Sequence, residues 1–184
     1  MSCLATAIIS FFIELITNID VVQIDIIKLK KVLLALIDNA NNFTQQGSVL
    51  LKISTRNIKN QFSLVFDVID TGIGISEEQQ KIIFKNFVQA DMTNTRKYGG
   101  LGLGLALSRA YCNLMGGDVS IESNLGSGTK ASVVIPIQGD GNEAKENKVD
   151  SNSYCSVLAI GIEKILEDSL ILPLSLNKNL FFNC

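Results

Sequence analysis

Residues 62–74 read FSLVFDVIDTGIG, and the rest of the chain is arranged around this stretch. Its first eight residues are rich in β-branched and aromatic side chains, which is typical of a strand. The strand leads into Asp70, which is followed by Gly72 and Gly74. Because glycine lacks a Cβ atom, such a loop lets the backbone approach a ligand closely. We therefore predict that Asp70 stands at a recognition position, where a buried strand meets a ligand-binding loop.

A second glycine cluster, YGGLGLGL, occupies residues 98–105. Apolar residues recur at helical spacing over 103–114, so this cluster ends at a helix N-terminus, where free N–H groups and the helix dipole attract phosphate. Its spacing differs from the dinucleotide-binding fingerprint, and neither cluster is followed by the Gly-Lys-Ser/Thr of a P-loop. Isolated glycines often serve only as turn or cap residues. Two clusters together with an acidic residue favour a small-molecule cradle instead.

The composition excludes several classes of protein. A length of 184 residues, 47% of them hydrophobic, suits one domain with its own core. Lysine plus arginine number 16 and acidic residues 18, so the net charge of −2 gives no support for nucleic-acid binding. Histidine, the commonest metal ligand and general base, is absent. The four cysteines are widely spread, which favours free thiols in a reducing compartment and hence the cytoplasm.

The N-terminal region predicts a strand followed by a helix. Residues 4–13 are apolar, but no positive residue precedes them and the run is too short to span a bilayer, so we expect no membrane segment. We assign residues 1–24 to a lead-in strand, covering 8–16, or a truncated N-terminal region. Asp25 is expected to cap a helix that runs through Ala40. The apolar residues of this helix recur at three- and four-residue steps: Ile26, Leu29, Val32, Leu33, Leu36, Ile37 and Ala40.

Two asparagines near the end of this helix have different expected roles. Asn39 falls between core positions, where a side-chain amide is costly unless it has a partner. Asn42 is followed by Phe43, Thr44 and Gly47, and this pattern fits a simple helix terminator.

The remaining pattern predicts two antiparallel hairpins and two helices. The first hairpin consists of strands at 49–54 and 62–69 with a turn at 57–60, and a helix capped by Ser76 follows and runs to about Phe84. The next helix covers 103–115 and ends at Gly116 and Gly117, and its predicted buried residues are Leu103, Ala106, Leu107, Ala110 and Leu114. The second hairpin consists of strands at 119–123 and 129–135. The polar residues 88–99 favour a mobile lid, with an ordinary solvated loop as the alternative. Residues 138–153 are predicted to be a linker, and 154–184 a tail without identifiable chemistry.

Taken in order, these motifs resemble the sequence boxes of the ATP-binding domain of sensor histidine kinases, and most closely those of hybrid bacterial sensor kinases. The matching residues are Asn39-Ala40 with Phe43-Thr44, DTGIG at 70–74, Phe84 with Phe87, GLGLG at 100–104, and GSGT at 126–129. The resemblance covers residues 25–137. It implies the GHKL fold, an α/β (α+β) two-layer sandwich in which helices cover one face of a mixed sheet and ATP lies between the layers.

The resemblance also implies roles for individual residues. Asp70 would accept a hydrogen bond from the adenine amino group, with Thr129 assisting and the purine lying against Gly72 and Gly74. Asn39 would ligate Mg²⁺ through its amide oxygen, and the second glycine cluster would wrap the triphosphate. The implied ATP-binding residues are Asn39, Asn42, Asp70, Gly72, Gly74, Lys97, Tyr98, Gly100, Leu101, Gly102, Leu103, Gly104 and Thr129.

The implied activity is phosphoryl transfer from Mg-ATP to a histidine on a separate or missing dimerisation domain, with a response-regulator receiver domain as a further partner. Three features depart from the family pattern. Ala35 stands where the family commonly has Asn, Asn42 stands where it usually has Lys, and Lys85-Asn86 replaces an acidic residue and Pro. Two alternatives stay open: a noncatalytic ATP-binding pseudokinase, favoured by Ala35 and Asn42, and an anti-sigma-type serine kinase and switch protein.

Overall fold

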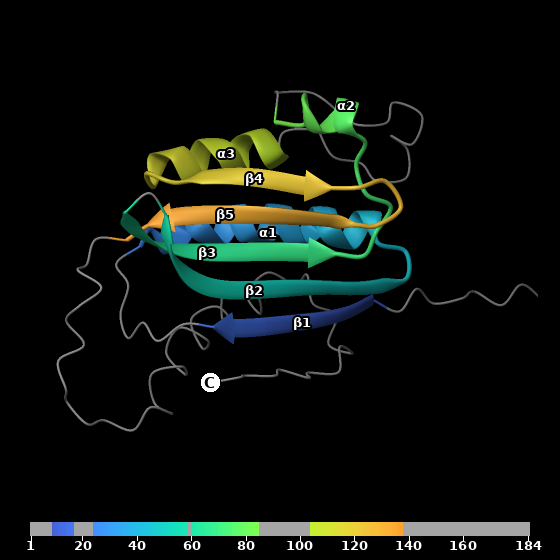
Figure 1. The fold of residues 1–184 in the computed structure, drawn as a ribbon, viewed down its shortest axis with the longest axis horizontal. Coiled ribbons are helices and arrows are strands. Elements are labelled where there is room, and N and C mark those ends of the chain that lie inside the picture. The colour runs from blue at the N-terminus through green and yellow to red at the C-terminus, as the bar shows by residue number, and fades with distance from the viewer. Residues whose placement is uncertain (1–8, 17–23, 59, 85–103, 138–184) are drawn as a thin grey trace, which may run out of the picture.

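The computed structural model describes residues 9–16, 24–58, 60–84 and 104–137. Within these ranges a mixed sheet of five strands carries α1 and α3 on one face, which is the predicted two-layer α/β sandwich (Figure 1). The elements in chain order are β1 (Ile9–Ile16), α1 (Ile26–Phe43), β2 (Gly47–Ile58), β3 (Gln61–Asp70), α2 (Glu77–Gln80), α3 (Gly104–Leu114), β4 (Asp118–Ser123) and β5 (Thr129–Pro136).

The strands lie in the order β1-β2-β3-β5-β4. β1 is parallel to β2, while β2 with β3, β3 with β5 and β4 with β5 are antiparallel, which confirms both predicted hairpins. Because β5 lies between β3 and β4, the end of β3 is placed beside the start of β5. This topology brings Asp70 next to Thr129, although 58 residues separate them in the sequence.

Helix α1 begins as the sequence predicts. The Asp25 side chain accepts a hydrogen bond from the backbone N–H of Lys28 at 3.0 Å, so it is the N-cap. The helix continues to Phe43, and the C-cap Thr44 donates its backbone N–H to the Ala40 carbonyl. Asn42 therefore lies inside the last turn, and its expected role as a helix terminator is wrong.

The core fills the space between the sheet and the helices. It contains six buried residues of α1, which are Leu29, Val32, Leu33, Leu36, Ile37 and Ala40. They pack on the alternating residues of β2 and β3 that face the helices, which are Val49, Leu51, Ile53, Leu64, Phe66 and Val68. The periodicity in the sequence thus identified the core face of α1 correctly from Leu29 to Ala40, whereas Ile26, in the first turn, is 48% exposed.

Helix α3 buries a different face from the one predicted. Ser108 and Cys112 are its buried residues, whereas Leu107 is 50% exposed and Leu114 is 71% exposed. Leucine and alanine occur on several sides of this helix, so apolar spacing alone did not define its inner face. Ser108 is tolerated inside because its hydroxyl donates to the Gly104 carbonyl at 2.8 Å.

Helix α2 is shorter than predicted. Ser76 and Gln79 form the expected capping box, since the Ser76 hydroxyl accepts from the Gln79 N–H and the Gln79 side chain accepts from the Ser76 N–H. The helix ends at Gln80, and residues 81–84 follow as a turn.

Candidate functional site

Asp70 is the last residue of β3 and pairs with Thr129, the first residue of β5. Asp70 is only 8% exposed, and its Oδ1 atom accepts hydrogen bonds from the backbone N–H groups of Gly72 at 2.8 Å and Thr129 at 3.2 Å. Within the part of the chain that the structure describes, no group donates to Oδ2. One carboxylate oxygen therefore holds the loop, while the other is left as an acceptor.

The environment of Asp70 is electrostatically unfavourable for its charged form. Burial raises the pKa of this carboxyl above its ordinary value, and the hydrogen bonds from Gly72 and Thr129 oppose the rise only in part. A carboxylate is a strong acceptor when it is ionised. A ligand that donates a hydrogen bond to Asp70 would therefore offset part of the cost of burying the charge.

Gly72 and Gly74 are required by the packing of the chain itself. A Cβ atom at Gly72 would lie 2.3 Å from the Phe43 carbonyl oxygen, and one at Gly74 would lie 2.1 Å from the Asn124 carbonyl oxygen. Gly74 also has a φ of +70°, a left-handed conformation that disfavours other residues. The sequence predicted that these glycines make room for a purine. The structure shows that they also let the end of α1 and the β4–β5 loop close in beside Asp70.

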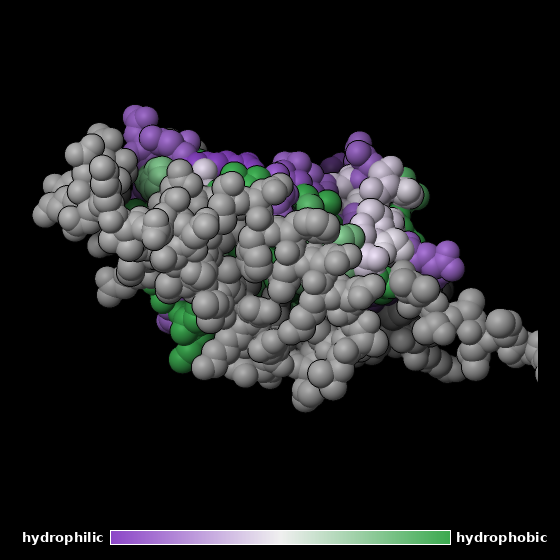
Figure 2. Space-filling view, turned by 90° about the horizontal axis from the view of Figure 1, so that it is seen from below, coloured by the Kyte–Doolittle hydropathy of each residue, from purple (hydrophilic) through white to green (hydrophobic). Residues whose placement is uncertain are grey.

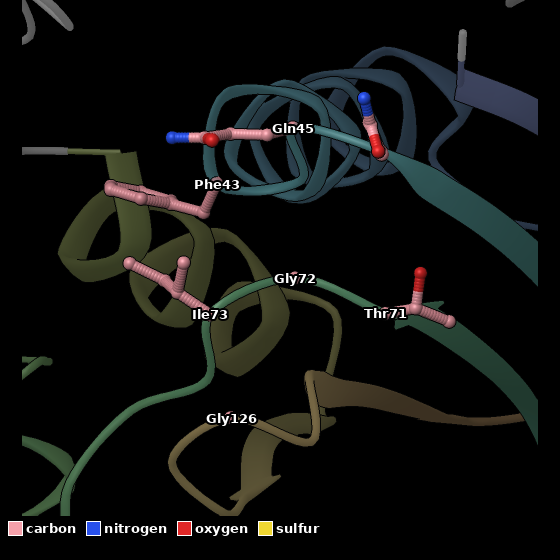
Figure 3. A pocket seen from close by; sticks show the side chains of 7 residues that line it. Phe43, Gln45, Thr71, Gly72, Ile73 and Gly126 are labelled. Carbon is pink, nitrogen blue, oxygen red and sulfur yellow. The ribbon is translucent and has the colours of Figure 1, made fainter. Parts of the chain in front are cut away.

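A hollow of about 400 Å³ opens beside this loop. Phe43 and Ile73 are 43% and 54% exposed, and their side chains extend in the same direction at its wall (Figure 3). The other lining residues are Gln45, Gln46, Thr71, Gly72 and Gly126. An exposed aromatic ring beside a branched apolar side chain is a surface on which a planar heterocycle can stack.

Sequence reasoning did not assign a binding role to Phe43 or Ile73. Phe43 entered the prediction only as part of the motif, and Ile73 only as the residue between two glycines. The available signal for Phe43 was an aromatic residue one helical turn after Asn39, at the end of the helix that approaches the loop.

Helix α1 contacts both the loop after β3 and Gly104, the first residue of α3. Its last turn contacts the first cluster, since the Ile73 N–H donates to the Phe43 carbonyl at 3.2 Å. Its middle contacts the end of the second cluster, since a Cβ built on Gly104 would lie 3.9 Å from the Ala35 Cβ. The start of α3 therefore lies beside α1 about one turn before Asn39.

The two asparagines lie between these contacts. Asn39 is partly exposed and Asn42 is exposed. Asn39 is therefore accessible in a partly enclosed position rather than buried in the core. Its amide oxygen is a hard, neutral donor of the kind that suits Mg²⁺.

The other predicted ligand residues lie outside the described ranges. They are Lys97, Tyr98, Gly100, Leu101, Gly102 and Leu103, and the same holds for Phe87, the proposed lid at 88–99, the linker and the tail. Thus the structure brings together Asp70, Gly72, Gly74 and Thr129, with α1 carrying Asn39 and Asn42 alongside and Gly104 beside Ala35.

Phe84 contacts α3 at the end of the segment that leaves the first cluster. The Arg109 guanidinium carbon lies 4.4 Å from the centroid of the Phe84 ring, and Arg109 Nε lies 3.2 Å from an oxygen of Asp118. The contact between the Arg109 guanidinium and the Phe84 ring stabilises the end of residues 81–84 against α3.

The chain is similar to proteins of one family over the region that builds this site. The family described as histidine kinase-, DNA gyrase B- and HSP90-like ATPases matches residues 24–139. The chain is 37% identical to the autoinducer 2 sensor kinase/phosphatase LuxQ of Vibrio cholerae, over 67% of the chain and 14% of that protein. It is 40% identical to the circadian input-output histidine kinase CikA of Synechococcus elongatus, over 68% of the chain and 16% of that protein.

The chain is also similar to a solved structure of this class. The crystal structure of full-length ShkA in complex with AMPPNP has a TM-score of 0.55 and 32% sequence identity, covering 69% of this chain and 26% of that one. The similar region is thus a small part of LuxQ, CikA and ShkA. Among the residues described for the present chain, no helix is long and apolar enough to cross a membrane.

Proposed function

Because the chain belongs to the family of histidine kinase-, DNA gyrase B- and HSP90-like ATPases, and contains the ATP-binding domain of a sensor histidine kinase, we propose that it binds Mg-ATP for phosphoryl transfer to a histidine on another domain or chain. We assign residues 25–137 to this domain, in agreement with the match over 24–139. The reducing compartment that the cysteine pattern favours is, we propose, the cytoplasm.

The observation that carries the proposal is the environment of the Asp70 carboxylate. Its Oδ1 atom is used by two backbone N–H groups, and its Oδ2 atom stays available as an acceptor within the described part of the chain. Phe43 and Ile73 line the adjoining hollow and offer an apolar stacking surface. An exocyclic amino group on a flat, aromatic ring matches both features, and adenine carries them together.

Asn39 is our candidate ligand for Mg²⁺. It is partly exposed on α1, between the Phe43 contact to the first cluster and the Ala35 contact to Gly104. A divalent cation bound there would neutralise charge on the phosphates. We propose that the second glycine cluster and the start of α3 receive the phosphates, since a helix N-terminus presents free N–H groups.

The exposed face of α3 is a suitable surface for binding a helix of a partner. Leu107 and Leu114 lie two helical turns apart on one side of α3 and are at least half exposed. We propose that a helix of the histidine-bearing dimerisation domain docks on these leucines, and that a receiver domain accepts the phosphoryl group afterwards. Relatives named hybrid signal transduction histidine kinases support this partner class.

Calorimetric titration with Mg-ATP tests the proposed binding site. Asp70→Asn keeps a carbonyl oxygen that can accept from Gly72 and Thr129 but replaces the second acceptor by an amide donor. We expect its affinity for ATP to fall about 10- to 100-fold, because a hydrogen bond to a charged group contributes about 1.5–3 kcal/mol. Asp118→Asn, at the opposite end of the sheet, is the matched control and should bind normally. Equal affinities for the chain and Asp70→Asn would contradict the adenine assignment.

The transfer step needs a separate experiment, because Ala35 and Asn42 favour the pseudokinase alternative. The chain is incubated with γ-labelled ATP and a histidine-bearing dimerisation domain. Label on histidine supports the kinase, label on serine of an added partner supports the switch protein, and ATP binding without transfer supports the pseudokinase.

A further inference from the structure

Ser123 occupies the centre of a hydrogen-bond network behind the proposed adenine site. Its hydroxyl oxygen accepts from the Ile75 N–H at 2.8 Å and donates to the Gly128 carbonyl at 2.7 Å. The same oxygen lies 3.0 Å from the Thr129 hydroxyl oxygen. Ser123 pairs with Thr129 across β4 and β5, and Thr129 pairs with Asp70 across β5 and β3.

Counting donors determines the direction of the bond between the two hydroxyl groups. A serine hydroxyl has one proton and two acceptor lone pairs. The Gly128 carbonyl can only accept, so it takes the single proton of Ser123. The bond between Ser123 and Thr129 must therefore use the proton of Thr129, and Ser123 is then fully satisfied.

This arrangement leaves the Thr129 hydroxyl with lone pairs and no free proton. Paired residues of antiparallel strands project their side chains to the same face, so Thr129 and Asp70 lie side by side on the helix-bearing face of the sheet. Both side chains then offer only acceptors to a ligand. A base with an amino group satisfies them, whereas a base with a carbonyl group at the same position does not.

We infer that Ser123 is a specificity-determining positioning residue, which holds the Thr129 hydroxyl as an acceptor and so favours a 6-aminopurine over a 6-oxopurine. This inference rests on the proposed function. Without the Ser123 oxygen, the Thr129 hydroxyl is free to turn and donate to a 6-oxo group. Ser123 thus acts through Thr129 and has no contact of its own with the nucleotide.

Gln80 keeps this network in place. Its Nε2 atom donates to the carbonyl oxygens of Ile75 at 2.9 Å and Ser123 at 2.8 Å. These bonds join the segment after the first glycine cluster to the end of β4, and so hold the Ile75 N–H close to the Ser123 hydroxyl. The position of Ser123 is therefore defined by both its side chain and its backbone.

The test compares the affinities of the full chain for ATP and ITP, which differ in the 6-amino and 6-oxo groups. The measured quantity is the ratio of the ITP to the ATP dissociation constant. We expect Ser123→Ala to lower this ratio about three- to tenfold, which is the range for one net hydrogen bond. Ser123→Thr, which keeps the hydroxyl, should retain the ratio. Ser127→Ala, an exposed serine in the same hairpin loop, is the control and should leave it unchanged.

A double-variant cycle separates this role from general loosening of the fold. If Ser123 acts through the Thr129 hydroxyl, adding Ser123→Ala to Thr129→Val changes the ratio no further. Thr129→Val alone also keeps the inference testable if Ser123→Ala does not fold, since it should lower the ratio as well. An unchanged ratio in the folded Ser123→Ala or Thr129→Val variant would overturn the inference while leaving ATP binding intact. No binding of ATP by the unmodified chain would overturn the proposed function and this inference together.

Discussion

Asp70 combines a structural and a proposed binding role in one side chain. Oδ1 is bonded to the Gly72 and Thr129 N–H groups, and burial raises the pKa of the carboxyl above its ordinary value of 3.8. A raised pKa in the folded chain means that the protonated form is favoured there. The contribution of the protonated Asp70 side chain to the free energy of unfolding is fully present below the pKa of Asp70 in the unfolded chain. This contribution is lost as pH rises through the pKa of Asp70 in the folded chain. At neutral pH the ionised side chain is therefore a cost to stability that ligand binding can offset.

The first prediction concerns the pH dependence of that cost. Asp70→Asn removes the buried charge and keeps the shape, so we expect its thermal unfolding midpoint at pH 7 to equal or exceed that of the unmodified chain. The advantage should shrink as pH falls through the raised pKa of Asp70, because the native carboxyl becomes neutral as well. Melting curves from pH 7 down to pH 4 measure this. A variant less stable at pH 7 would mean that the hydrogen bonds of the charged form outweigh its desolvation.

The second prediction separates two effects of glycine in the loops. Gly74 and Gly126 have similar left-handed conformations, with φ of +70° and +78°. A Cβ atom at Gly74 would strike the Asn124 carbonyl, whereas one at Gly126 has no described atom within 4 Å. We expect Gly126→Ala to cost about 1–2 kcal/mol in the free energy of unfolding, from conformation alone. Gly74→Ala should cost clearly more, and urea denaturation measures both. Equal losses would show that the loop moves aside at little cost.

Among the elements, α3 packs one face in the core and leaves apolar side chains exposed on the other face. Its inner face carries Ser108 and Cys112, and its outer face carries Leu107 and Leu114. Burial raises the pKa of the Cys112 thiol to about 11, so this thiol stays protonated at neutral pH and behaves as a small apolar group. The outer leucines are the surface on which we propose that a partner helix docks.

The third prediction tests this division of α3. Leu107→Gln with Leu114→Gln should change the free energy of unfolding by only about 0.5 kcal/mol and leave ATP affinity unchanged, since both side chains are exposed. Phosphoryl transfer to an added dimerisation domain should fall.

Cys112→Ser is the matched control on the buried face. It places a hydroxyl among apolar side chains and should cost about 1–3 kcal/mol. A large loss of stability in the Leu107→Gln, Leu114→Gln variant would show that the outer face of α3 packs against another part of this chain.

In the molecule as a whole, α1 links the loop after β3 to the start of α3. Ala35 lies beside Gly104 at the start of α3, and Asn42 is exposed in the last turn of α1. These two of the three departures from the family pattern lie outside the buried core, since Ala35 is partly exposed and Asn42 is exposed.

The fourth prediction follows from those positions. The chain contains no histidine, so it cannot phosphorylate itself on histidine. Ala35→Asn combined with Asn42→Lys should raise transfer to an added dimerisation domain, because each restores a polar or cationic group near the proposed phosphate site. One preorganised group typically contributes about 10²–10³ in rate. ATP affinity should change much less. Equal transfer rates for the unmodified chain and the double variant would mean that both groups are dispensable here.

The sequence was enough to predict the individual helices and strands, and its resemblance to the kinase family implied the fold class. β2 and β3 followed from period-two alternation, and β4 and β5 followed from two strand segments around a glycine-containing turn. The core face of α1 followed from three- and four-residue spacing, because this pattern encodes which side of an isolated helix is apolar. Asp25 and Ser76 were recognisable as caps because capping depends on neighbours within one turn. Periodicity and capping depend only on residues close together in the chain, so they can be recognised in the local sequence.

Other features depend on contacts between distant segments, which local sequence does not record. The inner face of α3 was set by packing on α1 and the sheet, which admitted Ser108 and left Leu107 outside. Phe43 became a wall of the hollow only when the end of α1 met the loop after β3. The row of Asp70, Thr129 and Ser123 exists because β5 inserts between β3 and β4. No single stretch of sequence records that insertion, since strand order is a consequence of global packing rather than of local periodicity.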